Sequence, residues 1–244
     1  MNYGQTLSTV DSADFDGTND YMLRGGALTG IADSKTGILS VWLRKDGGDG
    51  SILRIVSQAT RQSTQLNTLS SNNFDIIGQN AAGTQILRLV TSTTYTAGAT
   101  WLHILSSWNL AVAGSGSLYV NDVDDKTETT FTDDTIDYDG STDWAIGASS
   151  GGLVPFNGCL AELYFAPGQY LDFSIVANRR RFISANGKPV WLGTNGAIPT
   201  GTAPIVYQRV ADAAAVATFA TNLGTGGNFS ITGTLDTGST SPSD

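Results

Sequence analysis

Residues 101–123 read WLHILSSWNLAVAGSGSLYVNDV, and this stretch decides the fold of the chain. Its two parts, 101–109 and 116–123, have the β-branched and aromatic content of strands, and Ala, Gly and Ser separate them. The stretch therefore predicts a β-hairpin. Because side chains alternate across a strand, the first part presents two sets, Leu102, Ile104 and Trp108 on one face and Trp101, His103 and Leu105 on the other. We expect such a strand in the middle of a layered structure.

Short apolar runs separated by Gly, Asn, Asp or Ser recur along the chain and predict further strands. The alternation is clearest in 38–45, where Leu39, Val41 and Leu43 share one face. Many short strands at close spacing indicate a sandwich or a jelly roll. The predicted strands cover 21–24, 38–45, 51–58, 64–70, 74–79, 85–92, 144–149, 159–167 and 228–233.

Three segments have a different pattern. Residues 174–187 show apolar residues at helical spacing, a capping Ser174 and a final Asn-Gly, so we expect a short helix there. The Ala-rich residues 211–220 predict a second short helix. Residues 121–143 hold nine of the 22 carboxylates and one Lys. We expect a largely exposed loop there, because unpaired carboxylates are costly to bury.

The composition narrows the class of protein. The 244 residues include 29 Gly and only 14 % charged residues, which favours strands and turns over helices. The net charge of −9 argues against a nucleic-acid partner, because phosphate contacts need clustered Lys and Arg. The one basic run, Arg179 to Arg181, is interpreted as a solvated face. No membrane span and no signal peptide are expected, since the apolar runs are short and the first residues lack a basic region.

Cys159 and His103 are the only residues of their types. One cysteine cannot form an internal disulfide, and we expect Cys159 in the core because the sequence shows no basic neighbour to lower its pKa. His103 lies within a predicted strand, so we expect a structural role. One His and one Cys cannot supply the ligands of a zinc site.

Five phrases of the sequence carry a family resemblance: FDGTNDYM, ILSVWLRK, WLHILSSWN, GSLYVNDV and NGCLAELYFAP. Their order resembles that of laminin-G-like, concanavalin-A-like lectin/glucanase domains, with Asp122 where the family usually has Gly. The resemblance implies an all-β, concanavalin-A-like jelly-roll sandwich of antiparallel strands with one short helix and an irregular C-terminal extension. We expect an arm over 1–14, the jelly roll over 15–185, and an extension over 186–244 that packs on the jelly roll or on a neighbouring subunit.

Residues 178–207 and 222–235 are similar to the C-terminal portion of laminin-G-like proteins from tailed-bacteriophage structural modules. This resemblance implies a virion protein, assembled in the bacterial cytoplasm and displayed as a head decoration, a head fibre or a tail-associated fibre. Its partners would be capsid or tail proteins and further copies of itself, such as a trimer.

The positions of the carboxylate residues indicate whether the chain could hydrolyse a glycosidic bond. Glucanases of this fold carry an E-x-D-x-x-E pattern that places a nucleophile and an acid/base beside the glycosidic bond. The chain has two glutamates, Glu128 and Glu162, and neither precedes an Asp by two positions. We therefore expect no enzyme and no catalytic residue. A polysaccharide depolymerase whose Asp pair forms on folding stays open as an alternative.

Two kinds of ligand site stay open. Pyranose rings stack on exposed aromatic rings, which makes Trp42, Trp144 and Trp191 candidates for binding a host glycan. We expect no cofactor, with calcium as the alternative. Its candidate ligands are Asp14, Asp16, Asn19 and Asp20, or Asn121, Asp122, Asp124 and Asp125, although Asp16 and Asn19 also suit a turn. The sequence thus predicts a non-enzymatic virion surface protein, with a carbohydrate-binding lectin or receptor-binding fibre domain as the alternative.

Overall fold

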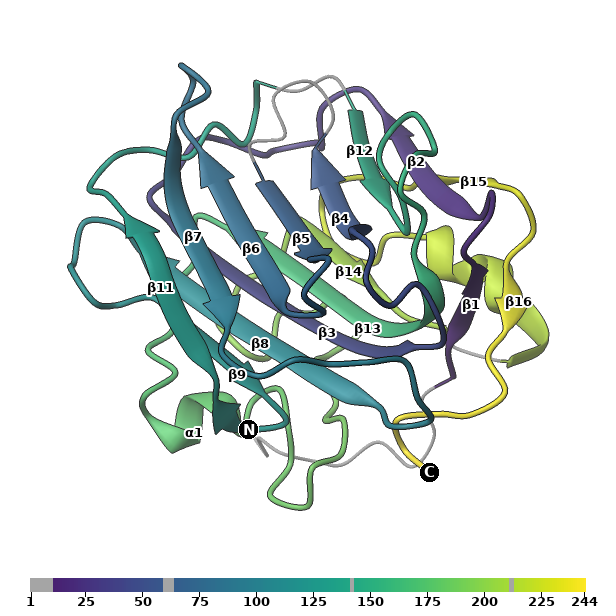
Figure 1. The fold of residues 1–244 in the computed structure, drawn as a ribbon. Helices are drawn as coiled ribbons and strands as arrows, with labels where there is room; N and C mark the ends of the chain where they lie inside the picture. Colours follow the sequence, from purple (N-terminus) through teal and green to yellow (C-terminus); the bar gives the residue numbers. More distant parts are fainter. Residues whose placement is uncertain (1–10, 59–63, 141–142, 211–212) are drawn as a thin grey trace.

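Two antiparallel sheets packed face to face form the body of the computed structural model, which describes residues 11–58, 64–140, 143–210 and 213–244 (Figure 1). In the first sheet, named here the β3 sheet, the order is β10 (Val123–Asp124), β9 (Ser117–Val120), β8 (Leu102–Asn109), β3 (Thr36–Lys45), β13 (Asn157–Pro167), β1 (Ala13–Asp16) and β16 (Asp236–Thr237). β14 (Val206–Gln208) also pairs with β13.

The second sheet, named the β6 sheet, faces the first (Figure 1). Its order is β11 (Lys126–Phe131), β7 (Gln85–Thr91), β6 (Phe74–Gln79), β5 (Thr64–Thr68), β4 (Leu53–Gln58), β12 (Asp143–Ile146), β2 (Tyr21–Gly25) and β15 (Ser230–Thr232). Each predicted strand has a counterpart in these two sheets. The all-β antiparallel sandwich expected from the sequence is therefore confirmed.

The hairpin predicted over 101–123 lies inside the β3 sheet. β8 pairs with β9 on one side and with β3 on the other. Leu102, Ile104 and Trp108 contribute to the core between the sheets, whereas His103 and Leu105 belong to the opposite face. The alternation in the sequence thus predicted both faces of this strand correctly.

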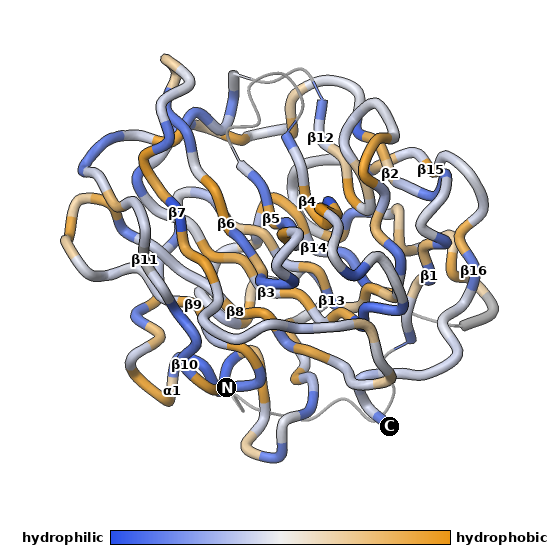
Figure 2. Tube along the Cα trace, viewed as in Figure 1, coloured by the Kyte–Doolittle hydropathy of each residue, from blue (hydrophilic) through white to orange (hydrophobic). Residues whose placement is uncertain are grey.

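Apolar side chains of both sheets fill the space between them, and Figure 2 shows the hydrophobic stretches along the central strands. Trp108 is fully buried there, and its Nε1 donates to the Tyr138 hydroxyl at 3.0 Å. Gly37 lies under the indole, where a Cβ atom would come within 2.3 Å of the ring. Burying a side chain of this size stabilises the fold by roughly 2–3 kcal/mol. Because a side chain at position 37 would collide with the indole, this burial requires glycine there.

A second apolar layer covers the outer face of the β3 sheet. In this layer the ring of Phe182 packs edge-on against Tyr164, at 5.2 Å between centroids, and against Phe173, at 5.6 Å. Because the segment after β13 supplies half of this layer, that sheet is buried on both faces. The layer consists of Ile38, Leu105, Tyr119, Tyr164, Ala166, Phe173, Phe182, Val190, Leu192 and Tyr207.

The helix expected over 174–187 is wrong in its extent. α1 covers Val176–Arg179, and Ile175 rather than Ser174 stands at its N-cap without a side-chain hydrogen bond. The chain then continues in turns that bury Phe182 and Ile183. Packing of these two side chains outweighs the helical pattern of the sequence.

A 3₁₀ helix, Ala213–Ala220, occupies most of the segment where a second helix was expected, and residues 211–212 lie outside the described residues. Its backbone has a kink at Ala215, where φ is −131° and ψ is 45°. Among the described residues, neither helix combines the length and the apolar content needed to cross a membrane.

The acidic stretch 121–143 is not a continuous exposed loop. β11 forms an edge strand of the β6 sheet by pairing with β7. Farther along, Ile136 and Tyr138 are fully buried. Threonine favours strands, so the Thr-rich residues of this stretch outweigh its charge.

The turn between β9 and β10 consists of Asn121 and Asp122, with φ of 50° and 68°. Asn and Asp adopt positive φ more readily than other non-glycine residues, so the turn stays tight without the family's Gly. The Asp122 carboxylate accepts bonds from Arg179 at 2.5 Å and from Arg180 at 2.6 Å. The prediction that the Arg run forms a solvated face is therefore wrong, because Arg179 and Arg180 join the end of α1 to this turn through ion pairs.

Candidate functional site

A cavity of about 460 Å³ opens on the outer side of the β3 sheet, near the start of β8. Trp42 of β3 and Trp101, which precedes β8, line it together. The cavity is large enough for a small ligand, and we name it the Trp101 cavity. Its other lining residues are Ala99, Asn121, Gly187, Lys188, Thr240, Ser241, Pro242 and Asp244.

Trp101 is half-buried, and its contacts hold the ring in place. Its Nε1 donates to the Thr240 hydroxyl at 3.0 Å, and the Arg44 guanidinium carbon lies 5.9 Å from the ring centroid. Trp101 was not among the ligand candidates predicted from the sequence. Strand alternation could have identified it, because the alternation places Trp101 and His103 on the face of the strand that points away from the core.

Trp42 is supported by His103. The two rings stack at 4.6 Å between centroids with 22° between their planes. His103 Nε2 lies 2.8 Å from the Ser40 hydroxyl, while Nδ1 is buried without a partner among the described residues, which fits the tautomer with hydrogen on Nε2. Burial lowers the pKa of His103 to about 3, so the ring is neutral at physiological pH. These contacts explain the structural role that the sequence predicts for His103.

Polar groups complete the Trp101 cavity. The Lys188 ammonium donates to the backbone oxygen of Asp244. The Asn121 side-chain oxygen accepts the backbone N–H of His103 at 2.7 Å, which leaves the amide group of Asn121 as a donor. An aromatic wall beside amide, hydroxyl and ammonium donors is an arrangement that can bind the hydroxyl groups and ring of a sugar.

The three tryptophans predicted as sugar platforms lie apart. Only Trp42 lines the Trp101 cavity, and it is 3 % exposed. Trp144 of β12 is 1 % exposed and lies between the sheets, with its ring 5.6 Å from that of Phe165. Trp191 is half-buried and does not line this cavity, and the Arg209 guanidinium carbon lies 5.0 Å from its ring centroid. We therefore base the candidate site on Trp42 and Trp101.

The first group of calcium candidates does not converge on one point. Asp16 accepts the backbone N–H groups of Thr18 and Asn19 at 2.7 and 3.1 Å, which closes a turn. Asp20 accepts the N–H of Thr234 at 2.8 Å with its other oxygen toward Asp16 N. These carboxylates stabilise the β1–β2 turn and its contact with the chain after β15.

The second group of calcium candidates is also divided between two structural roles. Asp122 binds the two arginines near α1, as described above. Asp125 is buried and accepts bonds from Thr93 N–H at 3.0 Å and from the Tyr95 hydroxyl at 2.7 Å. Asp125 therefore connects β11 to the loop after β7.

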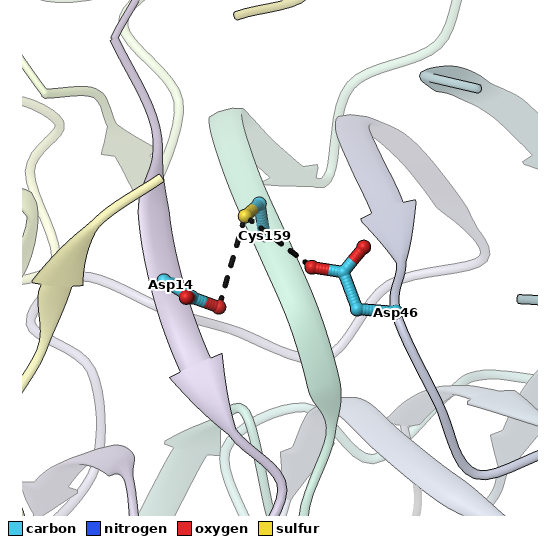
Figure 3. A group of neighbouring side chains, drawn as sticks. All are labelled: Asp14, Asp46 and Cys159. Carbon is cyan, nitrogen blue, oxygen red and sulfur yellow. Dashed lines mark hydrogen bonds between the residues drawn. The ribbon is translucent and has the colours of Figure 1, made fainter. Parts of the chain in front are cut away.

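Asp14, Asp46 and Cys159 point toward one another from three segments of the β3 sheet (Figure 3). The Cys159 sulfur lies 3.7 Å from Asp14 and 3.8 Å from Asp46. A metal ion could use such a group, but the Arg44 guanidinium already contacts it, at 2.6 Å from Asp46 and 3.4 Å from the sulfur. The expectation that Cys159 lacks a basic neighbour is therefore wrong. Burial still raises the pKa of its thiol to about 12, so the thiol is protonated.

Of the two glutamates, the structure describes the side chain of Glu162. This side chain is buried in β13. Its carboxylate accepts the Tyr207 hydroxyl at 2.8 Å and lies 3.2 Å from Arg209 Nε. Of the described residues that line the Trp101 cavity, Asp244 alone carries a side-chain carboxylate. Hydrolysis of a glycosidic bond by the usual mechanism requires a pair.

Comparison with known proteins identifies the class of this fold. Residues 16–168 match the concanavalin A-like lectin/glucanases superfamily, and the chain belongs to it. A candidate carbohydrate-binding protein from Bacteroides ovatus is similar with a TM-score of 0.64 and 11 % identity, over 95 % of this chain and 60 % of that one. The chain thus spans 60 % of the length of that protein.

A heptameric SAP-like pentraxin from Limulus polyphemus is similar with a TM-score of 0.55 and 13 % identity, over 95 % of this chain and 96 % of that one. At these identities the two similarities show the fold alone. A search of curated proteins found no match to the sequence.

Proposed function

We propose that this chain is a non-enzymatic carbohydrate-binding domain and that a sugar ring binds in the Trp101 cavity. The observation that carries the proposal is a half-buried tryptophan fixed by hydrogen bonding beside a cavity of about 460 Å³. An aromatic ring offers a flat apolar surface to the C–H groups of a pyranose, and the surrounding donors satisfy its hydroxyl groups.

Two further observations support binding without catalysis. The superfamily includes lectins, and the similar Bacteroides ovatus protein is described as a candidate for carbohydrate binding. Glu162 is held by Tyr207 and Arg209 and is not among the lining residues of the Trp101 cavity. The residues at this cavity therefore suit recognition of a sugar rather than general acid/base chemistry.

A glycan array with wild-type protein and two variants tests this proposal. Trp101→Ala removes the aromatic wall, and we expect it to weaken binding at least about tenfold. Trp191→Ala is the matched control, because Trp191 is also half-buried but does not line the cavity. We expect the control to retain wild-type affinity.

Circular dichroism of both variants separates a local loss of binding from a loss of fold. Equal binding by folded Trp101→Ala and wild-type protein would contradict the proposed site. Release of reducing ends from a bound polysaccharide would contradict the absence of catalysis.

The second candidate function is display on a virion, which the similarity of 178–207 and 222–235 to phage structural proteins favours. These residues include part of the second apolar layer, the first two residues of β14 and all of β15. In this proposal the domain is assembled in the bacterial cytoplasm with capsid or tail proteins. Immunogold labelling of purified particles tests it: labelled capsids or tails are expected, and particles without label would contradict it.

A further inference from the structure

A second cavity, of about 350 Å³, adjoins the Trp101 cavity, and we name it the Arg44 cavity. The two cavities share Ala99 and Thr240. Both shared residues are exposed and have short side chains. The two cavities therefore form one continuous groove at the surface. The Arg44 cavity is lined by Arg44, Asp46, Gly98, Ala99, Ser239 and Thr240.

The size of this groove suits a ligand longer than one sugar unit. The volumes of about 460 and about 350 Å³ each fall within the range of small-ligand pockets, which is roughly 300–1,000 Å³. Trp101 lines only the first cavity. A single ring stacked on its indole would leave the Arg44 cavity unfilled, so the groove has room for a further sugar unit beyond Thr240.

The Thr240 hydroxyl lies at the junction and has one hydrogen-bonding function left. Its oxygen accepts the Trp101 indole N–H at 3.0 Å and also accepts a bond from the Arg44 guanidinium. A hydroxyl has two acceptor lone pairs and one donor hydrogen. Among the described residues none accepts that hydrogen. It is therefore available to an acceptor of the ligand, such as the oxygen that links two sugar units.

The charges that line the groove cancel within each cavity. Arg44 binds both carboxylate oxygens of Asp46, at 2.6 Å each, in the Arg44 cavity. In the Trp101 cavity, Lys188 contacts the backbone oxygen of Asp244, whose carboxylate accepts the N–H of Ser241 at 2.7 Å. A sugar carboxylate is best bound by an arginine or lysine without a carboxylate partner. Such a cation is not among the described lining residues, so the groove suits uncharged sugars.

We propose, on the basis of the sugar site assigned above, that the two cavities together bind a neutral oligosaccharide of at least two units. One sugar ring stacks on Trp101, the next unit occupies the Arg44 cavity, and the Thr240 hydroxyl donates to an oxygen at the linkage. The protein thus recognises a segment of a glycan chain rather than one terminal sugar.

Titration calorimetry of the full chain with cello-, malto-, manno- and galacto-oligosaccharides of one to four units tests the chain length. In the series that binds, we expect the affinity to rise at least about tenfold from one unit to two. We also expect weaker binding of sialyllactose and of oligogalacturonate, which carry carboxylates. Equal affinity for one and two units would overturn the proposed groove, and tighter binding of the acidic sugars would overturn the preference for neutral ones.

Gly98→Leu tests the second cavity separately from the first, because Gly98 lines only the Arg44 cavity. A Cβ atom there meets nothing within 4 Å, and the residue does not have a positive φ, so the variant should fold. Its side chain fills the Arg44 cavity. We expect the affinity for the disaccharide to fall about tenfold, to that of the monosaccharide, while the affinity for the monosaccharide stays unchanged.

Gly151→Leu is the matched control, because Gly151 has the same open surroundings and lines neither cavity. It should bind both sugars as wild type does. Full disaccharide affinity in Gly98→Leu would overturn the proposal.

The hydroxyl at the junction is tested by two variants of Thr240. Thr240→Ser keeps the hydroxyl and should retain disaccharide binding, whereas Thr240→Val removes it and should weaken that binding about tenfold. Equal binding by the two variants would overturn the role of the hydroxyl.

The outcomes also separate this proposal from the sugar site on which it rests. Binding that is lost in Trp101→Ala but does not depend on chain length would overturn the groove and leave the sugar site standing. An absence of binding to every sugar tested would overturn both.

Discussion

Glu162 combines backbone strain with complete burial. Its φ is 48° at the bulge of β13, although it is not a glycine. Burial raises the pKa of its carboxyl to about 7, against partial compensation from Arg209 and Tyr207. A carboxyl that resists ionisation in the folded chain makes stability depend on pH.

Glu162→Gln tests this dependence. In the unfolded chain the carboxyl ionises near its ordinary pKa of about 4.5, and in the folded chain near about 7. The folded protein therefore binds more protons between these values, and this contribution to its stability is lost as the pH rises through about 7.

Since Gln does not ionise, the variant should gain stability relative to wild type as the pH rises from about 4.5 to about 7. Urea unfolding of both proteins across this range measures the difference. A constant difference would show that Glu162 ionises normally in the folded protein.

Only some of the residues that line the Trp101 cavity could be predicted from the sequence. Strand alternation places Trp42 and Trp101 on the outer face of one sheet, so the aromatic wall could be predicted. Thr240 and Lys188 reach the cavity from segments without regular alternation. Their positions depend on tertiary packing, which local patterns do not encode. The same holds for Arg44, whose contact with Cys159 joins two strands.

At the scale of elements, the β9–β10 turn combines two requirements in Asp122. The residue must adopt a φ of 68° and must bind Arg179 and Arg180. Asp122→Gly removes only the ion pairs, whereas Asp122→Ala also introduces strain at positive φ. We expect the Ala variant to be less stable than the Gly variant by about 1 kcal/mol.

Thermal unfolding of the two Asp122 variants and of wild type measures these contributions separately. The order of stability should be wild type, Gly variant and Ala variant. Equal stability of the Gly and Ala variants would mean that the turn relaxes and that Asp122 is not required for its geometry.

Strands were predicted more accurately than helices. Alternation is a local property, and it located β3, β6 and β7 within one or two residues. The helix over 174–187 failed because Phe182 and Ile183 are drawn onto the β3 sheet, a contact between distant parts of the chain. β11 was missed because the carboxylates of that stretch concealed its Thr-rich strand pattern.

At the scale of the whole molecule, the chain after β13 changes what the sandwich can bind. It buries much of the outer face of the β3 sheet under a second apolar layer. Both cavities described above lie against this sheet and include residues that follow β13. The sandwich itself follows from strand pattern and family resemblance, whereas these cavities depend on how 168–244 packs.

The most direct test of the account is the indole region of a ¹H–¹⁵N NMR spectrum, recorded while a glycan that binds on the array is added. The chain has five tryptophans, and Trp101→Phe assigns the signal of Trp101. We predict that the Trp101 indole signal moves with the binding curve, while that of Trp144, buried between the sheets, stays in place. Saturable glycan binding with an unmoved Trp101 signal would contradict the account.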